Sequence, residues 1–125
     1  MDTSTREINE YRRVANDIAQ NARAILGLRC TILVKFGCHW GRDFNFCHAA
    51  HVHWSGKKRG RICLNGRIVF EEYPLVGVGA SGEDVFDLIA HECTHLLGRG
   101  WVAHTEKFNA FSAALAYRLR RNNNL

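Results

Sequence analysis

The chain lacks most of the features that divide a protein into parts or direct it to a membrane. It has 125 residues, one proline and no serine- and glycine-rich spacer, so we expect a single domain over residues 1–125. Its apolar runs fall far short of the roughly 20 residues that span a bilayer. The first residues, Met-Asp-Thr-Ser-Thr-Arg-Glu, lack the apolar core of a signal peptide. We therefore expect a cytoplasmic protein without membrane contact.

The cysteines give no sign of a disulfide framework. There are five, an odd number, and none forms a C-x2-C pair, so we expect thiols that are mostly buried. Residues 38–53 contain Cys38 and Cys47 together with four histidines, of which His51 and His53 alternate and face one side of a predicted strand. This spacing matches no zinc-finger pattern. We therefore favour strand and loop packing over a second metal site there.

Positive charge is in modest excess. The net charge is +5 at pH 7, and the basic residues form three clusters: Arg12 and Arg13; Lys57, Lys58, Arg59 and Arg61; Arg118, Arg120 and Arg121. Such clusters can neutralise phosphates, and a solvated basic face explains them equally well. DNA is therefore a candidate partner that charge alone does not establish.

Hydrophobic periodicity predicts an α+β fold. Apolar residues recur at spacings of three and four over residues 4–26, where Ser4 and Glu7 fit a capping box and Gly27 fits the helix end. Short β-branched or alternating runs predict a small, mostly antiparallel sheet of three or four strands. These runs cover residues 30–36, 50–54, 61–65 and 67–70.

Two further helices are expected in the second half of the chain. The first should be capped by Ser81 and run from Val85 to about Leu97. The second should cover residues 105–121, with basic residues at its end as the helix dipole favours. Its predicted apolar stripe consists of Phe108, Phe111, Leu115 and Leu119.

The first of these two helices contains an H-E-x-x-H motif, His91-Glu92-Cys93-Thr94-His95. Residues four apart lie on one helix face, so both imidazoles can reach one metal ion. Glu92 is offset by about 100° from His91, which puts its carboxylate beside the open metal position as a general base. The alternative is a helix with two surface histidines, but the same helix has an apolar face that lets the histidines line a cleft.

A catalytic zinc site usually has three protein ligands and a water molecule. His104 is the leading candidate for the third ligand, since it follows His95 by nine residues and two glycines between them allow the chain to reverse. Glu106 is the rival, because a carboxylate can also complete such a site. If His104 leads the stripe of Phe108, it faces the core side and Glu106 turns away.

Several motifs together resemble the SprT-like (Spartan-like) zinc metallopeptidases. They are His91-Glu92-x-x-His95, then His104-x-x-x-Phe108 opening a helix, and upstream the strand Gly60-Arg61-Ile62-Cys63-Leu64-Asn65, similar to that family's G-x-I-x-L-N. With the N-terminal helix in the matching place, the resemblance covers about residues 8–119. It implies a minimal zincin-like core and hydrolysis of peptide bonds, in some members of proteins bound to DNA.

The sequence thus predicts a zinc metallopeptidase with His91, His95 and His104 as metal ligands and Glu92 as the catalytic base, acting on protein or peptide substrates. A nucleic-acid-binding module with a structural or vestigial zinc site is the alternative, although such a site has no use for Glu92. A zinc hydrolase with a non-peptide substrate also remains open, because the motif activates water without naming the bond attacked.

Two further features are expected around the cleft. Zincins often bind an extended substrate along a sheet strand, and Arg67–Glu72 or its neighbour is a candidate for that pairing. A hydrogen-bond donor for the oxyanion is also expected, with Tyr73 and Tyr117 as candidates.

Overall fold

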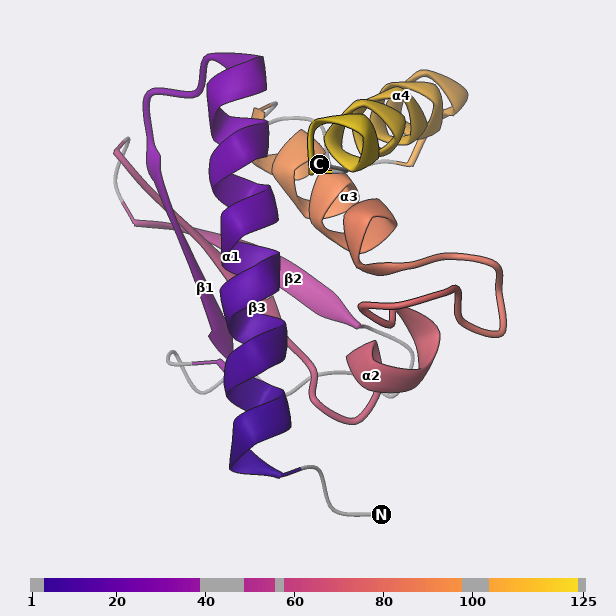
Figure 1. The fold of residues 1–125 in the computed structure, drawn as a ribbon. Coiled ribbons are helices and arrows are strands. Elements are labelled where there is room, and N and C mark those ends of the chain that lie inside the picture. The colour runs from indigo at the N-terminus through magenta and orange to yellow at the C-terminus, as the bar shows by residue number, and fades with distance from the viewer. Residues whose placement is uncertain (1–3, 39–48, 56–57, 98–103, 124–125) are drawn as a thin grey trace.

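The computed structural model describes residues 4–38, 49–55, 58–97 and 104–123, and the expected α+β class is confirmed (Figure 1). These residues form four helices and a three-stranded mixed sheet. The elements in chain order are α1 (Thr5–Leu26), β1 (Thr31–Phe36), β2 (Ala50–Ser55), β3 (Arg59–Leu64), α2 (Val69–Glu72), α3 (Val85–Leu97) and α4 (Glu106–Asn123). Among the described residues, no helix has the length and apolar character needed to cross a membrane.

The sheet has the order β1-β3-β2. β2 and β3 are antiparallel neighbours, as expected, but β1 runs parallel to β3. The expectation of a mostly antiparallel sheet is therefore wrong for one of the two pairings. β3 therefore lies between β1 and β2, although both precede it in the chain. Within the described sheet, β2 lies at an edge.

The expected fourth strand at residues 67–70 is wrong, because Val69–Glu72 forms the short helix α2. Asn65 turns the chain at the end of β3: its side-chain oxygen accepts a hydrogen bond from Arg67 N at 3.0 Å. Its carbonyl oxygen accepts from the backbone N–H groups of Ile68 and Val69, both at 3.1 Å. This local turn outweighs the β propensity of the residues that follow.

The N-terminal helix α1 is confirmed at both ends. The Ser4 hydroxyl accepts a hydrogen bond from Glu7 N at 3.1 Å, and Gly27 ends the helix at a φ of 64°, which favours glycine. The buried face of α1 packs with the sheet and α3 around one core. It consists of Tyr11, Ala15, Ile18, Ala19 and Ala22.

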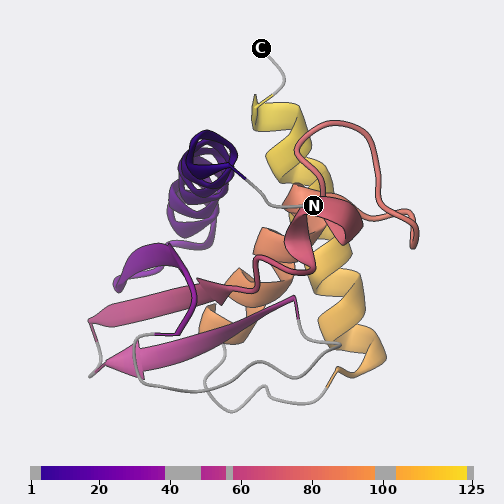
Figure 2. The same ribbon diagram turned by 90° about the horizontal axis from the view of Figure 1, so that it is seen from below.

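Helix α3 lies between α1 and α4 (Figures 1 and 2). It also approaches β3 closely, because a Cβ at Gly60 would lie only 3.0 Å from a methyl group of Leu96. On α4, three residues of the predicted stripe are buried, whereas Phe111 is 36% exposed. Ala116, which the predicted stripe did not include, is buried on α4.

The start of α3 differs from the prediction, because Asp84 and not Ser81 caps the helix. Asp84 Oδ1 accepts hydrogen bonds from Phe86 N at 2.9 Å and Asp87 N at 3.2 Å. Arg120 of α4 then binds both carboxylates, at 2.9 Å to Asp84 Oδ1 and 2.6 Å to Asp87 Oδ2. Partial burial by itself would raise the pKa of Asp84, but the hydrogen bonds from Arg120 and from Asp87 N lower it.

We predict that Asp84→Ala lowers the free energy of unfolding by about 1–2 kcal/mol, because it removes the helix cap and one of the two carboxylate partners of Arg120. Asp84→Asn keeps a capping oxygen and loses only a charge pair with a partly exposed arginine, so it should cost about 0.5 kcal/mol or less. Urea unfolding at neutral pH measures both values. Equal stability of the Ala variant and the wild type would contradict the cap.

The same variants have an expected pH dependence. Because the pKa of Asp84 is lowered in the folded state, its negative charge stabilises the fold at pH values above its ordinary pKa of 3.8. That contribution is lost as the pH falls through the lower folded value. The difference between wild type and Asp84→Asn should therefore vanish in acid.

Candidate functional site

The three predicted metal ligands meet where α3 packs against the start of α4. His91 and His95 lie one turn apart on α3, and His104 lies just before α4. His95 Nε2 lies 3.3 Å from His91 Nε2 and 3.1 Å from His104 Nε2. The three side chains form a group that could hold a metal ion, and Glu106 is not part of it. Of the two candidates for the third position, the structure brings His104 to the pair.

Phe108 is the packing centre of this group. It is fully buried, and its ring centroid lies 5.1 Å from that of His91, 4.6 Å from His95 and 5.2 Å from His104. The Thr105 hydroxyl accepts a hydrogen bond from Phe108 N at 3.1 Å, which caps α4 directly after His104. The capped turn and the phenyl ring therefore orient the three imidazoles.

The surroundings of His91 favour its neutral form, which can donate a lone pair to a metal. Burial, with smaller contributions from His95 and His104, lowers the pKa of His91 to about 4. Because His95 Nε2 lies close to a ring nitrogen of each of the other two histidines, protonating all three rings would cause strong repulsion. A neutral imidazole keeps a lone pair for a metal, and a cation relieves the crowding of these lone pairs. The donor set therefore fits a metal ion.

The histidines open onto a cleft of about 460 Å³. One wall is formed by Ala49 and the first residues of β2, and the other by α3. Glu92, the predicted base, lines this cleft although its side chain is only 5% exposed. Burial raises the pKa of Glu92 to about 8. A carboxyl with such a pKa can both accept and release a proton near neutral pH.

The two tyrosines proposed as oxyanion donors have different surroundings. Tyr73 lines the cleft, and burial followed by nearby acidic residues raises its pKa, so its hydroxyl keeps its proton. Tyr117 is 61% exposed on α4 and does not line the cleft. Tyr73 is therefore the tyrosine whose position suits an oxyanion donor.

The strand beside the cleft is β2. Ala50, His51 and Val52 of this strand line the cleft, and β2 is at an edge of the described sheet. The candidate segment Arg67–Glu72 contains the helix α2 instead of a strand, so β2 is the strand whose position suits such pairing. One sequence pattern already indicated an edge strand here, because apolar and polar residues alternate over residues 50–54.

A second group of side chains also could hold a metal ion: Cys38, His51, His53 and Cys63. The expectation of strand and loop packing did not include this group, because Cys63 lies on another strand and reaches the histidines only through the pairing of β2 with β3. Cys47 and His48, which the sequence places near these residues, lie outside the described part of the chain.

The basic clusters are partly engaged within the molecule. Arg13 pairs with Glu10 at 2.7 Å and Asp17 at 3.4 Å, and Arg120 pairs with the acidic start of α3. Lys57 lies outside the described residues. At least two of the clustered arginines therefore share their charge with carboxylates.

Comparisons with protein-family models, with curated proteins and with solved structures found no match to this chain. The resemblance to SprT-like peptidases therefore depends on the sequence motifs, and the site is described by its own geometry.

Proposed function

We propose that the protein is an intracellular, zinc-dependent metallopeptidase of SprT-like type with a minimal zincin-like core. In this proposal His91, His95 and His104 hold the zinc and Glu92 is the general base. The observation that carries it is the convergence of three imidazoles at a cleft that also contains a buried carboxyl. Three protein donors with a position left for water are typical of catalytic zinc sites, whereas structural sites have four.

The spacing of the nitrogen atoms supports zinc as the metal. Two nitrogens bound to one tetrahedral zinc ion lie about 3.3 Å apart. The distances from His95 Nε2 to His91 Nε2 and His104 Nε2 are 3.3 and 3.1 Å. When bound, zinc acts as a Lewis acid and makes water nucleophilic near neutral pH. Packing against Phe108 holds the three rings in place for this role.

Glu92 is the group proposed to move the proton. Its carboxylate takes a proton from the attacking water and passes it to the leaving amine. Burial raises its pKa to about 8, and a cation held by the adjacent histidines lowers the pKa again by favouring the charged form. Glu92 is therefore available as a base when the metal site is filled.

A peptide substrate is favoured over other substrates by the strand beside the cleft. β2 lies at a sheet edge, where an extended polypeptide can add as a further strand and be held by backbone hydrogen bonds. Tyr73 then donates a hydrogen bond to the oxygen of the carbonyl under attack. Proteins or peptides are the proposed substrates, and the resemblance suggests DNA-associated proteins among them.

A nucleic-acid-binding module with a vestigial zinc site has less support. Arg13 and Arg120, from two of the three basic clusters, are held in ion pairs. That function also gives no role to the Glu92 carboxyl, whose burial costs folding free energy.

The metal site is tested by counting bound zinc with native mass spectrometry. His104→Ala should bind one zinc ion fewer than the wild type under the same conditions, because it removes one of three ligands. Glu106→Ala, which removes the exposed rival ligand, should keep the wild-type count. The same loss in Glu106→Ala, or no loss in His104→Ala, would overturn the assignment of the third ligand.

The role of Glu92 is tested by activity at constant metal content. Glu92→Gln should keep its zinc and lose about 10²- to 10⁴-fold in kcat on an unfolded protein substrate, since it removes only the base. Glu83→Gln is the matched control, because Glu83 lines the same cleft and should retain activity. Undiminished proteolysis by Glu92→Gln, or zinc-loaded wild type that cleaves no protein substrate, would contradict the mechanism.

Tyr73→Phe should lower kcat by about 10²-fold with little change in KM, because the donor acts mainly on charge that develops during the reaction. The hydrogen bond from the Tyr11 hydroxyl to the Tyr73 carbonyl, at 2.7 Å, uses the backbone and survives the change. Tyr117→Phe is the control and should be indistinguishable from the wild type. A change in KM alone would assign Tyr73 to substrate binding instead.

A further inference from the structure

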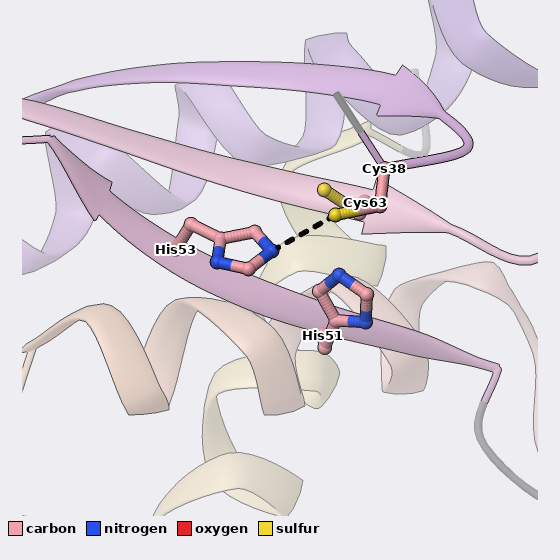
Figure 3. A group of neighbouring side chains, drawn as sticks. All are labelled: Cys38, His51, His53 and Cys63. Carbon is pink, nitrogen blue, oxygen red and sulfur yellow. Dashed lines mark hydrogen bonds between the residues drawn. The ribbon is translucent and has the colours of Figure 1, made fainter. Parts of the chain in front are cut away.

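We propose that Cys38, His51, His53 and Cys63 form a second, structural zinc site that ties the edge strand β2 to the rest of the sheet. The donor atoms of the four side chains lie within 4.8 Å of one another. Cys38 Sγ lies 3.2 Å from His53 Nε2, and the ring centroids of His51 and His53 are 4.7 Å apart. Figure 3 shows the two sulfur atoms beside each other and facing the imidazoles.

The sheet register explains how these side chains come together. His51 is the antiparallel partner of Cys63, and paired residues point to the same face of a sheet. His53 lies two residues further along β2 and therefore shares that face. Cys38 follows the end of β1, on the other side of β3. The four ligands thus come from β2, from β3 and from the residues just after β1.

The face that carries these ligands is the one turned away from the apolar core. Ile62 and Leu64, the neighbours of Cys63 on β3, belong to the core cluster. Cys63 is fully buried but is not a member of that cluster. Two cysteines and two histidines gathered on this face are not accounted for by packing in the hydrophobic core. A shared ligand gives this polar, sulfur-rich group a function.

The chemistry of the four donor atoms favours zinc as the metal and a structural role for it. Two thiolates and two imidazoles make the tetrahedral sulfur and nitrogen set typical of structural zinc. All four positions are filled by protein, so no position is left for water, unlike the three-histidine group. The Nε of Arg61 donates a hydrogen bond to Cys63 Sγ at 3.3 Å. Such an outer contact helps to orient the Cys63 sulfur.

This site would act on the cleft through β2. His51 belongs to the second group and also lines the cleft beside His91 and Glu92. A zinc ion bound here would crosslink the end of β1, β2 and β3, and so fix the edge strand in register. The presence of this metal does not depend on peptidase activity, so the two proposals can fail separately.

Cobalt is the probe that distinguishes the two sites. Thiolate-bound Co²⁺ has a sulfur-to-metal charge-transfer band in the near ultraviolet, which a site made only of histidines lacks. The reduced wild-type chain should bind two Co²⁺ ions, one of which produces this band. His104→Ala should bind one ion fewer and keep the band in full. Wild-type protein that shows no such band with excess Co²⁺ would overturn the proposal without any variant.

Variants assign the ligands. Cys38→Ser and Cys63→Ser should each weaken binding at the thiolate site by more than about 100-fold, since loss of an outer-shell partner alone costs 10- to 100-fold. Both should retain the three-histidine site, which shows that they fold. Cys30→Ala, which changes a buried cysteine outside the group, should keep the band. A band that persists in the Cys38→Ser/Cys63→Ser double variant would rule out these ligands.

Discussion

The packing of α4 against α3 is the contact on which the candidate site depends. His91 and His95 belong to α3, but His104 precedes α4 and reaches them only if the two helices keep one orientation. That orientation is held at both ends. Near the histidines, buried Phe108 fills the space between the helices. At the far end, Arg120 binds the carboxylates of Asp84 and Asp87 at the start of α3. The helices are thus antiparallel, with an apolar contact at the site and an ionic contact away from it.

The sequence predicted best what depends on residues close together in the chain. Helix α1 and its two caps, and the H-E-x-x-H motif on one face of α3, follow from spacings of three and four residues. His104 could be chosen over Glu106 because the turn that opens α4 brings His104 onto the face of Phe108. In each case the periodicity of one helix decides the result.

The features that the sequence did not predict depend on competition between alternative local structures, or on contacts between residues far apart in the chain. Asp84 replaced Ser81 as the cap because its carboxylate gains both the helix N–H groups and Arg120, a partner 36 residues away. The turn at Asn65 displaced the β-prone segment after it into α2. Cys63 joined the second metal group only through the pairing of β2 with β3, which no local pattern reveals.

The two groups that could hold a metal ion differ in a way that suits them to different proposed roles. The three-histidine group lies at a cleft and has three donors among the described residues, which suits the proposed chemistry on a bound water. The Cys-His group lies across the sheet and supplies four ligands, which favours stability over reaction. Between them stands β2, an edge strand paired on one side only within the described sheet.

An edge strand that must receive a substrate cannot be protected by a further strand on its open side, because the substrate needs those backbone groups. It therefore has to be held from its paired side and from its faces. β3 supplies the paired side, and Ala50 and Val52 pack against the core on one face. A metal bound by His51 and His53 would fasten the other face. On this argument the second site would be the means by which the open sheet edge keeps its register beside the proposed catalytic groups.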